Sequence, residues 1–184
     1  MTLSLLALFL AISLPALGGL LCRRALDAAA ARLAGAMAMT RQEAIARGRY
    51  AGLVFKRAQG GDWYAIHIDG GRRGIRTSEV ASGVDPRIHG PIPVGTSEDG
   101  VQLGIPLQPP IRCVPPSTGV LPPGGDPIRL GSSDILSFSP IGESTSGSIY
   151  LTDGHGGLRA VVVYGRSGRI RVWEWTPDMN WRRQ

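Results

Sequence analysis

The feature that most constrains this 184-residue chain is an uncharged apolar run near its start. Residues Leu3 to Cys22 contain no Asp, Glu, Lys or Arg. At about 1.5 Å per residue they form roughly 30 Å of helix, which is the thickness of a bilayer core. Pro15 lies inside the run, and a lipid-embedded helix tolerates it with a mild kink. The sequence therefore predicts a membrane-spanning helix over residues 1–24.

A cleaved signal peptide is the alternative interpretation of this run. We favour a retained helix, because no basic residue precedes the run, its length exceeds that of a signal core, and no small-x-small site stands between Leu17 and Arg24. Arg23 and Arg24 follow the run, and the positive-inside rule taken alone would place that side in the cytoplasm. This orientation conflicts with the one that the resemblance described below implies.

Helical periodicity continues beyond the run. Apolar residues recur at three- and four-residue steps, and no proline interrupts them before Gly48: Leu26, Ala30, Leu33, Met37 and Ala44. We predict an amphipathic helix over residues 25–49 that Gly48 ends. Leu26, Leu33 and Met37 are its candidate packing residues. They either cover the chain's own globular domain or pack against a neighbouring helix in an assembly, and both can hold.

Residues 50–184 have the pattern of a β-rich globular domain. "AGLVF" and "WYAIHI" predict a strand pair, and "DGGRRGIRTSEVASGVDP" predicts a loop. Eight of the 14 prolines lie between Pro106 and Pro127, a stretch that cannot hold an inner strand or helix, so we expect an irregular Pro-rich segment over 104–132. "DILSFSP", "GSIYLTD", "LRAVVVYG" and "GRIRVWEW" then predict four short strands. The predicted fold class is α+β, a long N-terminal helix followed by an antiparallel β-sheet domain.

The charge and the cysteines restrict function only broadly. The net charge of +6 is carried almost wholly by arginine, with Lys56 as the single lysine. Such a chain suits contact with phosphate or acidic lipid, and an ordinary solvated surface is the alternative. Cys22 lies at the membrane end of the run and Cys113 in the Pro-rich segment, so no disulfide framework is expected.

The sequence contains no constellation typical of an enzyme. "GESTSG" has its serines at the wrong offsets for a nucleophile elbow, and His155 in "DGHGG" has no nucleophile beside it in the sequence. Asp69 could open a calcium loop, but Arg72 and Arg73 occupy positions where carboxylates would be needed. We therefore expect a turn with exposed arginines there, and we predict no catalytic residue, cofactor or metal.

The last predicted strand carries the one candidate ligand surface. Alternation places Arg169, Arg171, Trp173 and Trp175 on one face, and Ile170 and Val172 on the other. Guanidinium groups beside indoles suit phosphate contact with base stacking, so DNA is a candidate partner for Arg169, Arg171, Trp173, Arg182 and Arg183. The alternative is a solvent-facing edge where arginines discourage strand pairing and indoles pack on arginine stems.

Taken together, these segments resemble the GspH/FimT family of type II secretion minor pseudopilins and type IV pilin-like proteins. "MTRQEAI" followed by "ARGRYAGLVF" is similar to that family's helix end and first strand. "GIRTSEVASGVDPRIHGP" is similar to its central loop, and "SFSPIGESTSG" and "GRIR" are the most specific of the C-terminal pieces.

The resemblance implies a structural subunit and not an enzyme. Such a subunit is anchored in the inner membrane by one helix, with its C-terminal domain in the periplasm, and packs beside other pseudopilins in a short filament for protein secretion. The resemblance also leaves open a FimT-type subunit that binds DNA during uptake or competence, since Gly168, Arg169 and Arg171 match a basic G-R-x-R tail.

The start of the chain departs from the family's pattern. The family's basic leader, Gly-Phe cleavage point and nearby glutamate do not appear before "MTLSLL". The spacing from Pro15 to Glu43 is similar to the family's own spacing from its helix proline to the glutamate of its Arg-x-Glu-Ala element at the helix end. We therefore expect that the leader and cleavage site lie upstream of Met1, where the leader would supply the cytoplasmic positive charge.

Overall fold

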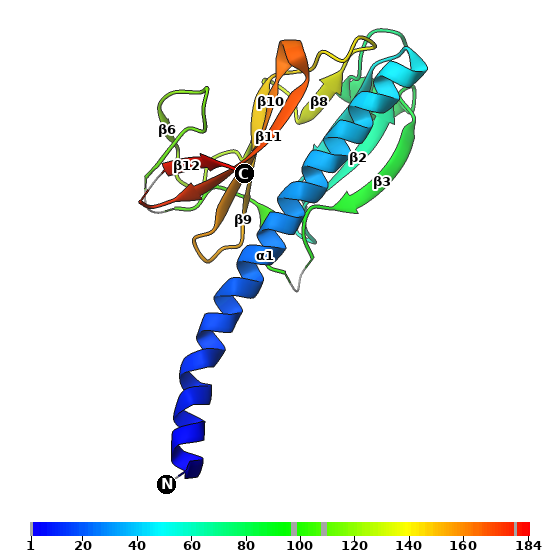
Figure 1. Ribbon diagram of the computed structural model, residues 1–184. Helices are drawn as coiled ribbons and strands as arrows, with labels where there is room; N and C mark the ends of the chain where they lie inside the picture. Colours follow the sequence, from blue (N-terminus) through cyan, green and yellow to red (C-terminus); the bar gives the residue numbers. More distant parts are fainter. Residues whose placement is uncertain (1, 97–98, 108–109, 179) are drawn as a thin grey trace.

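The computed structural model describes residues 2–96, 99–107, 110–178 and 180–184, and the side chains of its first helix from Cys22 onward. That helix, α1 (Thr2–Arg47), precedes a domain made of antiparallel strands (Figure 1). The predicted α+β class, one long helix followed by antiparallel sheets, is confirmed. The predicted membrane-spanning segment, residues 1–24, lies almost wholly outside the described side chains.

Helix α1 ends where the sequence predicted. Gly48 adopts a left-handed φ of 59°, which costs a glycine nothing sterically. The Gly48 N–H donates to the carbonyl of Ile45, and the Arg49 N–H donates to that of Ala44. These two bonds form a Schellman motif that satisfies the last carbonyls of the helix. The chain then enters the first strand within three residues.

The first sheet contains four antiparallel strands in the order β3-β2-β1-β8. Their bounds are β1 (Ala51–Lys56), β2 (Trp63–Ile68), β3 (Arg87–Pro93) and β8 (Ile135–Phe138). The predicted pairing of β1 with β2 is confirmed, with Ala51 opposite Ile68. The predicted loop between β2 and β3 contains a short helix, α2 (Thr77–Ser82), and the edge strand β3 was not predicted.

The second sheet has the order β12-β11-β10-β9-β4, and β7 also pairs with β9. Its strands are β4 (Gln102–Leu103), β7 (Ile128–Arg129), β9 (Gly147–Thr152), β10 (Leu158–Tyr164), β11 (Arg169–Thr176) and β12 (Asn180–Arg183). A short 3-10 turn, η1 (Gly165–Ser167), joins β10 to β11 in the predicted hairpin. Strand β12 was not predicted.

Helix α1 packs across both sheets and closes the main core. Leu26, Leu33 and Met37 are 0%, 1% and 0% exposed. They belong to the same cluster as Leu53 of β1 and Val161 of β10. The structure therefore shows that the stripe covers the chain's own domain, the first of the two predicted alternatives.

The Pro-rich segment is packed more closely than its composition suggested. It holds the two-stranded sheet of β5 (Ile111–Arg112) and β6 (Val120–Leu121), separate from both larger sheets. Ile111, Val114 and Leu121 are buried against the face of the second sheet that is turned away from α1. Because both faces of β10 are thus covered, its sequence is a nearly continuous apolar run.

Candidate functional site

Small side chains form one stripe along the solvent side of α1, which also carries the exposed Arg32, Met39 and Ile45. The side against the sheets carries the large residues Leu26, Leu33 and Met37. The solvent side carries small residues spaced three and four apart, with one amide at the end: Ala28, Ala31, Gly35, Ala38 and Gln42. We call these five residues the small-residue side of α1. A Cβ at Gly35 would meet nothing within 4 Å, so no contact inside the chain requires glycine there.

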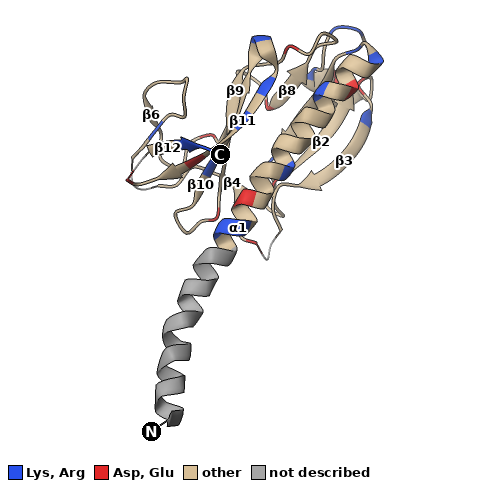
Figure 2. Ribbon diagram, viewed as in Figure 1, with Lys and Arg blue, Asp and Glu red and all other residues tan. Residues whose placement is uncertain are grey.

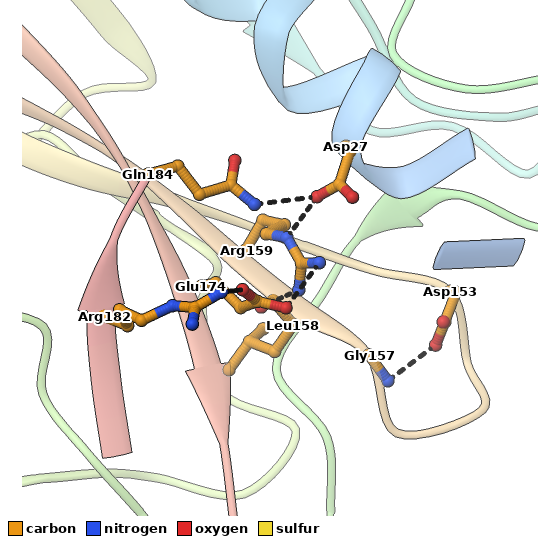
Figure 3. Close-up of polar contacts among 8 residues, drawn as sticks. All are labelled: Asp27, Asp153, Gly157, Leu158, Arg159, Glu174, Arg182 and Gln184. Carbon is orange, nitrogen blue, oxygen red and sulfur yellow. Dashed lines mark hydrogen bonds and ion pairs between the residues drawn. The ribbon is translucent and has the colours of Figure 1, made fainter. Parts of the chain in front are cut away.

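A buried arginine joins α1 to the second sheet. Arg159 of β10 is 3% exposed, and its Nε donates to Asp27 of α1 at 2.6 Å (Figure 3). Its Nη2 donates to Glu174 of β11 at 3.0 Å. Asp27 also accepts a hydrogen bond from the C-terminal residue Gln184, at 2.9 Å. The Arg159 guanidinium thus links α1 to β10 and β11. Asp27 also links α1 to Gln184.

The same contacts keep Asp27 ionised. Partial burial alone would raise its pKa, but the hydrogen bonds from Arg159 and Gln184 and the positive charge of Arg159 outweigh that burial. The pKa of Asp27 therefore lies below its usual value near 3.8. The buried guanidinium of Arg159 is thus paired with two carboxylates, those of Asp27 and Glu174.

Three segments that carry the family resemblance meet at the C-terminal end of α1. Arg41, from "MTRQEAI", donates through its Nε to the carbonyl of Gly142, from "SFSPIGESTSG", at 3.0 Å. Gly168, the first residue of "GRIR", has a φ of 58°, and a Cβ there would lie 2.7 Å from Arg41 Nε and still nearer the Gly142 carbonyl oxygen. The glycine is thus explained by close packing of the hairpin turn on the helix.

Four of the five candidate DNA-binding residues gather on one face of the second sheet. Arg169, Arg171, Trp173 and Arg183 line a shallow pocket of about 270 Å³, together with Tyr164 and Ser167. Trp173 lies opposite Arg183 in the β11–β12 register. None of these described lining residues is acidic. Figure 2 shows basic positions along β12 and at the tip of the β10–β11 hairpin.

The fifth candidate, Arg182, lies on the other face. Its Nη2 pairs with Glu174 at 3.1 Å, within the network around Arg159 (Figure 3). Neighbouring strand residues point to opposite faces, so Arg182 and Arg183 cannot act on one ligand surface together. Trp175 has the predicted orientation but is only 8% exposed, because the Pro-rich segment packs over it.

The segment that begins at Asp69 matches its prediction only in part. Arg72 and Arg73 are exposed, as expected for a turn. However, Asp69, Glu79 of α2 and Asp85 each bring one carboxylate oxygen within 4.8 Å of the others. Sequence reasoning considered Asp69 alone and missed the other two, because a loop of irregular path brings them together.

Sequence reasoning also missed the ion network around Arg159. The available signal was one arginine inside the apolar strand "LRAVVVY", where a buried charge needs partners. Its partner Asp27 lies 132 residues away in the sequence. Cys22 and Cys113 are both free.

Comparisons with known proteins add one match. The model of the family described as "Type II transport protein GspH" matches residues 29–105, from the packed part of α1 to just beyond β4. The searches of curated proteins and of solved structures gave no match. Among the described residues, no helix has the length and apolarity needed to cross a membrane.

Proposed function

Because the chain belongs, through residues 29–105, to the family of the type II transport protein GspH, we propose that it is a minor pseudopilin. In this proposal it is a structural subunit of the type II secretion pseudopilus and serves protein secretion across the outer membrane. Its family consists of structural pseudopilins and not of enzymes. Its partners are other pseudopilins, met through α1.

The observation that carries this proposal is the small-residue side of α1. Leu26, Leu33 and Met37 are already buried in the domain, so they cannot serve a second helix, whereas Met39 and Ile45 are exposed on the solvent side. Ala28, Ala31, Gly35 and Ala38 lie along the opposite side. Small residues at such spacing let two helix backbones approach closely. A neighbouring pseudopilin helix would therefore pack on this side.

Cross-linking tests that contact. In a background with Cys22 and Cys113 changed to Ala, we place a cysteine at Ala38, on the small-residue side, or at Ala58, in the exposed turn before β2. Under a bismaleimide, Ala38→Cys should give adducts with cysteines in the helices of the machine's other pseudopilins. Ala58→Cys should give few. Adducts of equal yield from both positions would contradict the proposal.

We also propose that the protein is a single-pass inner-membrane protein with its β domain in the periplasm. The uncharged run from Leu3 to Cys22 supports the anchor. A fusion of alkaline phosphatase after Gln184 should be active, since that enzyme works only outside the cytoplasm. An inactive phosphatase, with a cytoplasmic reporter active at the same position, would refute this topology.

A second candidate function is DNA binding by a FimT-type subunit of a type IV pilus. The pocket lined by Arg169, Arg171, Trp173 and Arg183 favours it, because three guanidinium groups and an indole can meet phosphates and a base. Arg182 is not part of this surface, since Glu174 pairs with it.

Gel-shift titration of the whole protein in detergent, at about 50 mM salt, tests the second function. If duplex DNA binds, the Arg169→Ala/Arg171→Ala variant should have a shallower log–log salt slope, by about 0.9 for each phosphate that it no longer neutralises. Arg49→Ala/Arg87→Ala removes two exposed arginines elsewhere and serves as the control. The absence of any shift with wild-type protein would remove DNA binding and leave the secretion role.

A further inference from the structure

We propose that Asp69, Glu79 and Asp85 form a binding site for a divalent cation, with calcium as its best-fitting ion. The three residues come from the end of β2, from α2 and from the turn before β3. The proposal is independent of the pseudopilin role, because it rests only on the chemistry of this loop. We call the three carboxylates the acidic cluster.

The size of the cluster fits one calcium ion. One oxygen of each carboxylate lies within 4.8 Å of the others. Calcium binds oxygens at 2.3–2.6 Å, so two ligands on opposite sides of the ion stand about 4.8 Å apart. All three donors are carboxylates, which calcium and magnesium accept and which zinc or copper sites rarely use alone.

Two oxygens of the cluster have no hydrogen-bond partner among the residues that the structure describes. Asp69 is 1% exposed, and its Oδ2 accepts the N–H of Gly74 at 2.8 Å, but its buried Oδ1 accepts nothing. The buried Oε2 of Glu79 is equally unpaired. A buried carboxylate oxygen without a donor is costly. A cation among the three carboxylates would satisfy both oxygens at once.

Backbone N–H groups of the loop hold the third carboxylate, that of Asp85, in place. Asp85 is 1% exposed, and its two oxygens accept the N–H groups of Gly70 at 3.0 Å and Arg76 at 3.2 Å. Gly71 leaves Glu79 room, since a Cβ there would lie 3.0 Å from Glu79 Oε2. Because Glu79 is partly exposed, an ion can enter from its side.

The part of the chain that the structure describes supplies no cationic side chain to this cluster. Within the described ranges, none of the ion pairs at 4.0 Å or less involves these three carboxylates. Asp153 provides a contrast, because its Oδ1 accepts the N–H groups of both His155 and Gly157, at 2.8 Å each. The Asp153 carboxylate is thus satisfied by backbone N–H donors. In the acidic cluster, by contrast, two oxygens have no donor among the described residues.

The test is calcium binding by the full chain, purified in detergent and freed of metal with EDTA. Calorimetric titration with CaCl2 should show one site, and MgCl2 should bind more weakly because it demands a stricter octahedral geometry. With free calcium at about ten times the dissociation constant, the unfolding midpoint should rise by about 3–6 °C. The same midpoint in EDTA and in about 10 mM calcium would overturn the proposal.

Variants tie the response to the cluster. Glu79→Gln keeps the side-chain shape, removes one charge and should weaken calcium binding at least about tenfold. Asp69→Asn is the second variant, and its remaining oxygen can still accept the N–H of Gly74. Glu143→Gln makes the same change at an exposed site and should bind calcium like the wild type. A response that survives in both cluster variants, or is lost in Glu143→Gln, would also overturn the proposal.

Discussion

Met37 and Met39 lie two residues apart on α1 and meet different surroundings. Met37 is 0% exposed in the main core, whereas Met39 is 37% exposed on the solvent side. Met39 borders the small-residue side, where Ala31, Gly35 and Ala38 leave the helix backbone accessible. This difference indicates that the two sides of α1 have different roles. Leu26, Leu33 and Met37 attach the helix to its own sheets, and in our proposal the small-residue side receives a second helix.

Truncating these two methionines separately gives the largest expected effect. Met37→Ala removes a fully buried side chain and should lower the free energy of unfolding by about 2–5 kcal/mol. Met39→Ala should change it by less than about 0.5 kcal/mol, because its side chain stays partly in water. Chemical unfolding followed by tryptophan fluorescence compares the two. Similar losses in both variants would show that the solvent side of α1 also packs within the chain.

The end of α1 offers the next largest effect. Gly168→Ala should cost about 2–4 kcal/mol, since it adds steric conflict with Arg41 and Gly142 to the strain of a positive φ. Gly154→Ala has a φ of 71° but nothing within 4 Å, so it should cost only the strain of about 1–2 kcal/mol. The same unfolding assay applies. Equal costs would mean that the hairpin turn is not packed on the helix.

A smaller effect concerns pH. The folded-state pKa of Asp27 is lowered, so its pairing with Arg159 contributes stability above the unfolded-state pKa near 3.9 and loses it as pH falls through the folded value. At pH 7, the free energy of unfolding of the wild type should exceed that of Asp27→Asn by about 0.2–1 kcal/mol. The difference is modest because the side chain of Asp27 is half exposed. The difference should shrink between about pH 4 and pH 2. A difference that grows on acidification would contradict this assignment.

The sequence predicted the parts of the fold that depend on local periodicity. Gly48 ended the helix, and the strands of alternating or apolar pattern, such as β1 and β10, formed where expected. Strand β12 was not predicted because "NWRR" has no apolar alternation and pairs only through its neighbour β11. The edge strand β3, with two prolines, has the composition of a loop.

The candidate sites were less predictable, because their members are distant in the sequence. The pocket containing Arg169 and Arg171 followed from alternation along one strand, but the separation of Arg182 from Arg183 required knowledge of β12. The Asp27–Arg159 pair and the acidic cluster depend on contacts that no local rule spans. Leu26, Leu33 and Met37 are buried within one chain, and for this reason our proposal places the assembly contact on the opposite side of the helix.

The variant that tests assembly most directly should change stability only slightly, and in the stabilising direction. Gly35→Leu fills the small-residue side and should raise helix stability by up to about 1 kcal/mol, because glycine is a poor helix former. A Cβ at Gly35 would meet nothing within 4 Å, so the new side chain starts into open space. Gly60→Leu makes the same change in an exposed turn with equal room, and serves as the control.

The decisive measurement is the amount of secreted protein released by cells whose only copy of this chain carries Gly35→Leu, at matched protein levels. We predict that secretion falls strongly although the variant is folded and at least as stable as wild type, whereas Gly60→Leu secretes normally. Normal secretion by Gly35→Leu would contradict the claim that a neighbouring helix packs on this side of α1.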